Sequence, residues 1–307
     1  MRDWLGDRIL LGVTALAAFG IVVLMALIIW RVIHGSSAAW DKFGLSFIWG
    51  MDWDANPAKN LFGALPGLYG TAVTSLIALI IAAPLGIAIA LFLSELAPRG
   101  IREVVGSLVE MLAAIPSVVL GLWGILVMGP FVADHIEPWL NKWFGFLPIF
   151  SGDPSSSGVF IAGLILGIMV VPIVASICRE LFVSVPEDQE EAALALGSTR
   201  WEMVRGVVLS SSKPGIAAAL ILGLGRAIGE AIAVTQVIGA AWEINRSLFP
   251  PGDTLASRIA GQFIGAGTDI QRSALFYLAA LLLVIGLVTN LLAQLIVRHY
   301  AVSRSGA

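Results

Sequence analysis

The chain has 307 residues, of which 58% are hydrophobic and 13% are charged, and its mean hydropathy is +0.92. A soluble domain carries roughly 25% charged residues, so this composition excludes a soluble protein and indicates an integral membrane protein. The net charge of −3 and the lack of basic runs argue against a nucleic-acid partner. The single cysteine, Cys178, excludes an internal disulfide and a cysteine-based metal site.

A helix that crosses a bilayer needs about 20 mainly apolar residues. The first apolar run is longer than the core of a signal peptide, so we expect a retained span. The third run is interrupted by Pro116 and several glycines. Polar stretches are too short for a soluble domain, which predicts an all-α fold with one transmembrane domain over residues 1–307. Six segments qualify as spans, at about residues 9–33, 70–96, 104–131, 157–183, 214–240 and 274–298.

Six spans place both termini on the same side of the membrane. If that side is the cytoplasm, ten lysines and arginines lie in the shorter inside segments and seven in the longer outside ones. This distribution favours cytoplasmic termini. In the last outside segment Asp253 could meet another protein, but the neighbouring Pro250-Pro251-Gly252 favours an ordinary solvated turn. The outside tryptophans are expected to be interface anchors, namely Trp40, Trp49, Trp53, Trp139, Trp143 and Trp242.

Residues 185–209, between the fourth and fifth spans, predict two short helices joined at a glycine. Ser184 and Glu187 fit a capping box that opens the first helix, and Gly197 is its expected end. Residues 199–202 fit a second capping box. Such a helix–Gly–helix unit could insert into a groove on another protein, or its helices could lie on the lipid surface. The acidic first helix argues against the lipid alternative, because anionic lipid repels it.

Within this loop, Glu191-Ala192-Ala193 followed by Gly197 resembles the EAA loop of binding-protein-dependent ABC importer permeases. The resemblance implies a type I ABC importer permease architecture, in which this loop carries the motion of a separate ATPase into the membrane. The family often ends the motif with Leu-Pro, whereas proline is delayed here to Pro214, a departure that does not threaten docking. The coupling residues implied are Glu190, Glu191, Ala192, Ala193, Leu196, Gly197 and Trp201.

The fifth span contains two charged residues, Arg226 and Glu230, which are four apart and can pair on one helix face. Inserting each charge at a helix centre costs about 3 kcal/mol. The aliphatic residues of the span balance this cost without exceeding it, so we expect partner helices or water around the polar face. The guanidinium is suited to phosphate-like oxygens, with Glu230 as a modulator. The alternative is a buried pair that only fixes helix packing. Gly223, Gly225 and Gly229 allow close helix approach or backbone access.

Residues 223–234 also resemble the signature of phosphate-specific ABC importer permeases of the PstC type. Four further stretches agree, at residues 69–75, 91–98, 112–119 and 254–263, although Gly261-Gln262-Phe263 stands where the family usually has Asn-Glu-Phe. The resemblance implies that Arg226 and Glu230 take part in phosphate translocation. It also implies a heterodimer with a sister permease of the PstA type, two ATPase subunits and an extracytoplasmic phosphate-binding protein, in the bacterial cytoplasmic (inner) membrane.

No lysine in the chain follows a glycine, so there is no Gly-Lys-Ser/Thr phosphate loop. We therefore expect a transport subunit, not an enzyme, with no cofactor of its own and with ATP on the partner ATPase. Two rival functions are the import of sulfate, molybdate or another oxyanion by the same machine, and gradient-driven secondary transport. A secondary transporter has no reason to carry the helix–Gly–helix loop. A membrane enzyme is disfavoured because no residue cluster has catalytic spacing.

Two further sets of polar residues have alternative interpretations. Thr71, Thr74 and Ser75 fall on one side of the second span, where they could line a polar path or bond back to carbonyls of their own helix. We favour bonding to their own helix. Glu110 lies in the third span, which the resemblance places near the pathway, but we favour a simple pair with Arg102 at the cytoplasmic end.

Overall fold

The computed structural model describes the backbone of residues 2–302 and the side chains of residues 7–292, 294 and 295. The predicted all-α fold with six spans is confirmed: the helical segments that are long and apolar enough to cross a membrane are Asp7–Gly35, Leu65–Leu96, Ser117–Phe144, Val159–Val183, Arg200–Gly229 and Asp269–Leu292. The strands within the described residues are β1 (Trp53–Asp54) and β2 (Leu61–Phe62), which form an antiparallel hairpin.

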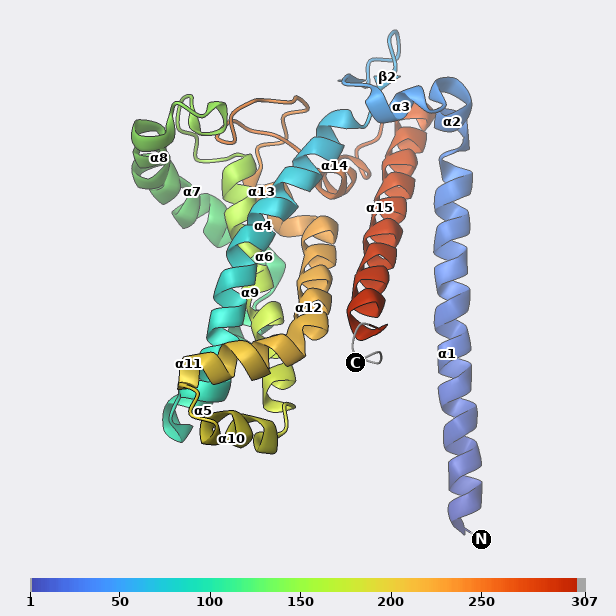
Figure 1. Ribbon diagram of the computed structural model, residues 1–307. Helices are drawn as coiled ribbons and strands as arrows, with labels where there is room; N and C mark the ends of the chain where they lie inside the picture. The colour runs from blue at the N-terminus through green and yellow to red at the C-terminus, as the bar shows by residue number, and fades with distance from the viewer. Residues whose placement is uncertain (1, 303–307) are drawn as a thin grey trace.

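Five spans are built on a single long helix each, and shorter helices gather at the two ends of the bundle (Figure 1). The long helices are α1 (Arg2–Gly35), α4 (Leu65–Leu91), α9 (Val159–Val183), α12 (Leu209–Gly229) and α15 (Asp269–Val302). The third span joins α6 (Ser117–Trp123), α7 (Gly129–Phe131) and α8 (Glu137–Phe144) through π-helical turns. The remaining helices are α2 (Ser37–Phe43), α3 (Ser46–Trp49), α5 (Arg99–Ala114), α10 (Glu187–Ala195), α11 (Arg200–Met203), α13 (Ile232–Val237) and α14 (Leu255–Gln262).

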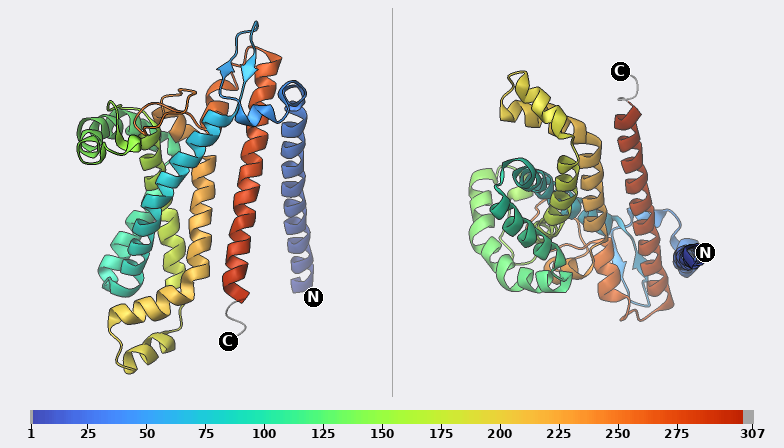
Figure 2. Two further views of the ribbon diagram at one scale, coloured as in Figure 1. Left: turned by 45° about the horizontal axis from the view of Figure 1, so that its top comes forward. Right: turned by 90° about the horizontal axis from the view of Figure 1, so that it is seen from below.

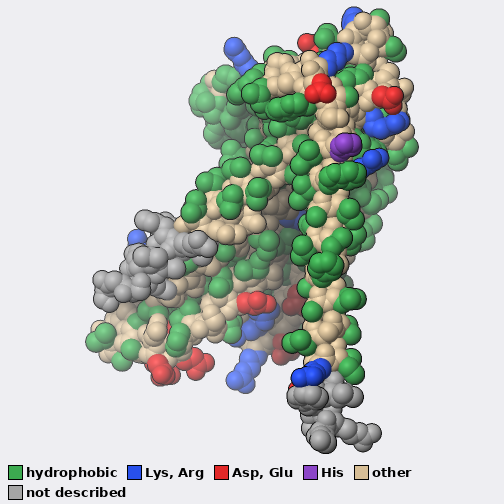
Figure 3. Space-filling model, turned by 90° about the vertical axis from the view of Figure 1, so that its right-hand side faces the viewer, with side chains coloured by type: hydrophobic (Ala, Val, Ile, Leu, Met, Phe, Trp, Pro, Cys, Tyr) green, Lys and Arg blue, Asp and Glu red, His purple; other side chains and the backbone are tan. Residues whose placement is uncertain are grey.

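The two ends of the bundle differ in what they carry. The start of α1, the end of α15, and helices α5, α10 and α11 lie at one end, which we call the loop end (Figures 1 and 2). The β1–β2 hairpin lies with α2, α3, α8 and α14 at the other, the hairpin end. Hydrophobic side chains cover the middle of the face that α1 presents, and charged side chains gather towards its ends (Figure 3). Both described ends of the chain therefore lie on the same side of a membrane-sized apolar band.

The core is centred on α9, because 67% of the most apolar stretch of this helix is buried within the chain. Helix α4 packs closely along it because small residues leave room. A Cβ added at Gly163 of α9 would lie 2.7 Å from Ile77, and one at Gly86 of α4 would lie 2.8 Å from Val174. In contrast, α1 packs mainly against α15 and α2, and its most apolar stretch is 0% buried within the chain. Lipid or another protein must cover α1.

The third span begins and ends later than predicted, because Pro116 interrupts the helix. Ile115 is extended (φ −65°, ψ 126°), as the residue before a proline usually is, so α5 ends at Ala114 and the span starts at Ser117. Residues 132–144, expected in an outside loop, continue the helix instead. The prolines in α7 and α8 directly follow the π-helical turns, where the helical hydrogen-bond pattern changes and a missing N–H is tolerated.

The separation of α5 also alters the predicted partner of Glu110. The Arg102 guanidinium turns back and donates to the Ser94 carbonyl at 2.5 Å, so it is not available to a carboxylate two turns further along α5. Glu110 Oε1 lies 3.9 Å from Nη1 of Arg179 on α9. The predicted pair with Arg102 is therefore wrong.

The predicted solvated turn at Asp253 is also wrong. Asp253 is 3% exposed, and its Oδ2 lies 2.7 Å from Nε of Arg258, which is 6% exposed. The second oxygen accepts a hydrogen bond from the Thr254 amide at 2.9 Å. Burial raises the pKa of the Asp253 carboxyl, and the charge of Arg258 acts in the opposite direction. This pair links the 239–254 loop to α14 at the hairpin end.

Two of the predicted interface tryptophans complete this cluster. The Arg258 guanidinium carbon lies 4.4 Å from the ring centre of Trp242 and 5.6 Å from that of Trp53. Both rings are half-buried, so they act as cation–π partners and do not serve as free anchors. The other four, Trp40, Trp49, Trp139 and Trp143, are between 51% and 72% exposed, as an interface anchor requires.

The α4–α9 contact predicts a sharp difference between two glycine substitutions. Gly163→Leu places a side chain where Ile77 lies, and we expect a loss of about 1–3 kcal/mol in the free energy of unfolding. Gly20→Leu on α1 is the matched control, since an added Cβ there meets nothing within 4 Å. Thermal unfolding of the detergent-purified chains measures both; equal midpoints would contradict close packing of these helices.

The buried ion pair predicts a second effect on stability. Asp253→Ala leaves Arg258 buried without a counter-charge, and we expect a loss of about 3–5 kcal/mol. The double variant Asp253→Leu/Arg258→Met removes both charges and should recover much of that loss in the same unfolding measurement. Asp54→Ala, which breaks the exposed pair with Lys59, is the control and should change little. If Asp253→Ala unfolds like this control, the pair does not stabilise the hairpin end.

Candidate functional site

Arg226 and Glu230 form an ion pair at the point where the fifth span breaks. Arg226 Nη2 lies 3.2 Å from Glu230 Oε2. The sequence predicts one continuous span over residues 214–240, but α12 ends at Gly229, and Glu230 is extended (φ −74°, ψ 116°). The pair therefore bridges a helix end and does not lie on one helix face.

The two partners have very different surroundings. Glu230 is 4% exposed, and its second carboxylate oxygen accepts a hydrogen bond from the Ala233 amide at 3.2 Å, in the first turn of α13. Arg226 is 49% exposed although it lies within the span. A role limited to helix packing accounts for the buried carboxylate. It does not account for a guanidinium that is half open at membrane depth.

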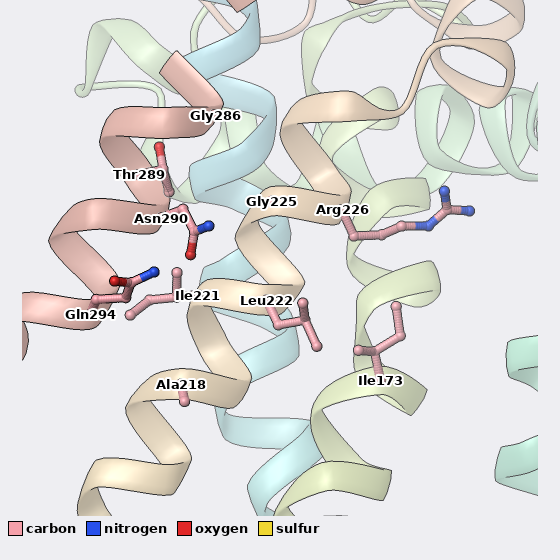
Figure 4. Close-up of a pocket in the computed structure, with 10 residues that line it drawn as sticks. All are labelled: Ile173, Ala218, Ile221, Leu222, Gly225, Arg226, Gly286, Thr289, Asn290 and Gln294. Carbon is pink, nitrogen blue, oxygen red and sulfur yellow. The ribbon is translucent and has the colours of Figure 1, made fainter. Parts of the chain in front are cut away.

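Arg226 borders an open cavity of about 890 Å³ on the surface of the subunit. Its lining comes from α12 (residues 218–226), α15 (residues 286–294) and Ile173 of α9. Figure 4 shows Arg226 extending away from α15, whereas Asn290 and Gln294 extend from α15 towards α12. The cavity is thus bounded by a cation on one side and by uncharged amides on the other.

The glycines of the fifth span have two different roles. A Cβ added at Gly223 would lie 2.6 Å from Val170, so this residue permits close approach to α9. At Gly225, and at Gly286 across the cavity, an added Cβ meets nothing within 4 Å. These two glycines leave the cavity open. Gly223 is therefore required for helix packing, whereas Gly225 leaves room in the cavity.

The polar residues of α15 were not identified as candidates from the sequence. Thr289, Asn290 and Gln294 all line the cavity. The sequence nevertheless marks these three residues, because they interrupt an apolar run that extends from residue 278 to residue 297. Polar side chains within a span are costly and are therefore indicators of function.

The hydroxyls of the second span lie away from this cavity. Thr71, Thr74 and Ser75 are at most 4% exposed, and each donates to the carbonyl four residues earlier on α4, at 2.6–2.8 Å. Thr71 Oγ1 also accepts a hydrogen bond from the Leu255 amide of α14 at 3.0 Å. These bonds agree with the favoured expectation that the three hydroxyls bond to carbonyls of their own helix. That the three residues line a pathway stays a prediction.

The loop over residues 185–209 forms two helices joined at a glycine. Gly197 has φ +88° and ends the first, as predicted, and the second capping box is present, with the Thr199 amide 2.7 Å from Glu202 Oε2. The first capping box is wrong: Ser184 still belongs to the end of α9 and donates to the Leu181 carbonyl, so α10 begins after Pro186 without a side-chain cap.

The second loop helix continues into the membrane. Residues 200–229 form one helical segment that passes through a π-helical turn, and Pro214 lies inside α12. The fifth span thus begins earlier than predicted. Its 30 residues have a contour length of about 45 Å, and the helix bends between α11 and the upright part of α12 (Figure 1).

The predicted coupling residues divide into two groups by exposure. Ala193 packs against the core, and Glu190 is half-buried, with its pKa raised by burial and then by Glu95 and Glu187. The other five are exposed, namely Glu191, Ala192, Leu196, Gly197 and Trp201. Leu196 is 90% exposed and Trp201 64%, so the loop end presents apolar side chains beside acidic ones. Such a surface is suited to another protein.

Comparison with known proteins assigns this arrangement to a family. The phosphate transport system permease proteins PstC of Pasteurella multocida (strain Pm70) and Xylella fastidiosa (strain 9a5c) are 43% and 42% identical to this chain. Each alignment covers 92% of this chain, and it covers 89% and 87% of the relative, respectively. A subunit of a bacterial alginate ABC transporter has a TM-score of 0.58 at 19% identity over 96% of both chains, which confirms the importer permease fold.

The family model of binding-protein-dependent transport system inner membrane components matches residues 82–302. This range contains the loop at the loop end, the ion pair at the helix break and the cavity beside it. The chain is a multi-pass membrane protein that belongs to the family of binding-protein-dependent transport system inner membrane components.

Proposed function

We propose that this chain is the permease subunit of an ATP-binding-cassette importer that moves inorganic phosphate into the cytoplasm. The observation that carries the proposal is Arg226, a half-exposed guanidinium at membrane depth beside an open cavity of about 890 Å³. A guanidinium that is paired on one side only is costly in hydrocarbon, so an aqueous anion pathway is the environment that suits its open side. The names of the relatives, which are phosphate transport permeases, support phosphate as the anion.

Arg226 would contact the phosphate, and Glu230 would moderate the contact. A guanidinium offers paired N–H donors that match two phosphate oxygens. Glu230 already occupies one side of it at 3.2 Å and is fixed by the Ala233 amide, so the arginine carries only part of its full attraction for an anion. This arrangement favours transient binding over permanent capture.

The partners follow from the surfaces that the subunit leaves uncovered. We propose that a sister permease of the PstA type closes the cavity, and that a phosphate-binding protein delivers its ligand at the hairpin end. Two ATPase subunits would bind ATP and dock at the loop end, where Leu196 and Trp201 are exposed. The chain itself would bind no cofactor. The loop end, with both termini, would then face the cytoplasm of a bacterial cell.

The continuous helix over residues 200–229 suggests how ATP hydrolysis reaches the anion. Movement of the ATPase would displace the loop near Gly197. Because the helix that follows is unbroken as far as Gly229, this displacement would shift Arg226 relative to α13, beyond the break. Alternating access would then be a change at the Gly229–Ala231 break. A gradient-driven carrier has no use for this connection.

Substitution of Arg226 tests the proposed phosphate contact. In proteoliposomes that contain the assembled transporter, we expect Arg226→Ala to lower phosphate uptake by at least about tenfold, the value of one hydrogen bond to a charged group. Arg226→Lys should keep part of the uptake. Arg272→Ala, which alters an exposed arginine at the hairpin end, is the control.

Two further measurements make the outcome decisive. The double variant Arg226→Ala/Glu230→Gln avoids a buried unpaired carboxylate, so a defect that persists in a correctly assembled double variant cannot come from misfolding. Competition of labelled phosphate with sulfate and molybdate identifies the cargo. Full uptake by Arg226→Ala would exclude a phosphate contact, and equal competition by sulfate or molybdate would favour the other oxyanion.

Gly197 tests the coupling role of the loop. Proline cannot adopt φ +88°, whereas asparagine tolerates this region. We therefore expect Gly197→Pro to abolish ATP-dependent uptake and Gly197→Asn to retain most of it, with equal amounts of each chain in the membrane. Uptake that is indifferent to ATP and to both substitutions would show a gradient-driven carrier.

A further inference from the structure

The last span, α15, contains three polar residues within an otherwise apolar stretch. Between residues 278 and 295, the only polar side chains are Thr289, Asn290 and Gln294. Asn290 and Gln294 are both exposed. The other exposed large side chains of this stretch are apolar and are 44–62% exposed, namely Leu283, Val284, Leu287, Val288, Leu291, Leu292 and Leu295. These three polar residues, which we call the polar stripe, line the cavity beside α12 together with Gly286.

The polar stripe lies on the wall of the cavity opposite Arg226. Asn290 and Gln294 are four residues apart, so they share a helix face, and both extend towards α12 (Figure 4). The cavity stays open beside them because Gly225 and Gly286 leave space where a Cβ would project. Neither amide makes a hydrogen bond to any described residue. At membrane depth, an amide in this situation requires water or a polar ligand.

The stripe also has a direction. Helix α15 runs from the hairpin end to the loop end, so Gln294 lies nearer the loop end than Gly286 does (Figures 1 and 4). Helix α12 runs the opposite way, and its lining begins at Ala218, eight residues before Arg226 on the side of the loop end. The amides therefore lie between the level of Arg226 and the loop end, on the α15 wall of the cavity (Figure 4).

We propose that Asn290 and Gln294 form a second phosphate contact, on the exit side of Arg226. Each carboxamide offers two N–H donors without a charge. A neutral donor can hold an anion that has left the guanidinium, yet binds it weakly enough for release, which is the balance that conduction requires. The described residues that line this cavity include no acidic side chain that would repel the anion. The inference rests on the proposed import of phosphate towards the loop end.

Thiol labelling tests whether water and phosphate reach these positions. The only cysteine, Cys178, is 0% exposed, so Cys178→Ala gives a suitable background. Asn290→Cys and Gln294→Cys are then probed in the assembled transporter, in membranes, with a charged thiol reagent applied from the loop end. Leu291→Cys on the same helix is the matched control, because it is exposed but does not line the cavity.

We expect the cysteines at positions 290 and 294 to react, and inorganic phosphate to slow both reactions. The control cysteine should stay unlabelled with or without phosphate. Protection of positions 290 and 294 from the reagent in the assembled transporter would overturn the proposal, because a helix of the sister permease or lipid would then cover the amides. Reaction that phosphate does not slow would also overturn it.

Transport measurements separate this inference from the proposed function itself. Asn290→Leu/Gln294→Leu should lower phosphate uptake about tenfold, the value of one hydrogen bond to an anion, while assembly with the partner subunits is unchanged. The exchange Asn290→Gln/Gln294→Asn should restore most of the uptake, and Leu291→Ala should have no effect. Absence of phosphate uptake by the wild-type transporter would refute the proposed function. Normal uptake by both the wild type and the leucine variant would refute the amide contact alone.

Discussion

The cost of a charge in hydrocarbon is the constraint on which this structure depends. A guanidinium at membrane depth has to be paired, hydrated or covered by protein. The subunit satisfies only one side of Arg226, through Glu230, and leaves half of the side chain open to a cavity. The fold is therefore incomplete as a single chain in lipid. In the proposed importer, a partner subunit and water in a pathway would both supply what is missing.

Within this pair, Glu230 has a structural role. Its carboxylate lies between a cation and the Ala233 amide, and it is almost fully buried. It thus connects the end of α12 to the start of α13 across the break at residues 229–231. In the proposed mechanism, a motion that reaches α12 from the loop end would change the position of Arg226 relative to this carboxylate. The affinity of the arginine for an anion would then depend on the geometry of the helix break.

The sequence predicted the elements that depend on local rules and missed those that depend on packing. Hydropathy located the six spans, and Gly197 and the second capping box marked the loop helices. The first capping box failed because Ser184 belongs to the end of α9 and donates to a carbonyl of that helix. The limits of the third span were misplaced because Pro116 breaks an apolar run that hydropathy reads as continuous. Burial of Asp253 could not be predicted, since its partners Arg258 and Trp242 meet it only in the folded chain.

The two arginine–carboxylate pairs show how a functional charge differs from a structural one. Arg258 is 6% exposed and lies against Asp253, Trp242 and Trp53, so a carboxylate and two aromatic rings enclose its guanidinium. Arg226 has the same chemistry and a partner that is equally buried, but 49% of its own side chain is open. Sequence distance does not distinguish them, because the partners are five residues apart in one pair and four in the other. The difference lies in what surrounds the cation. Where aromatic rings enclose the arginine, it holds a loop to a helix. Where a cavity lies beside the arginine, its guanidinium keeps the open side that the proposed anion contact requires.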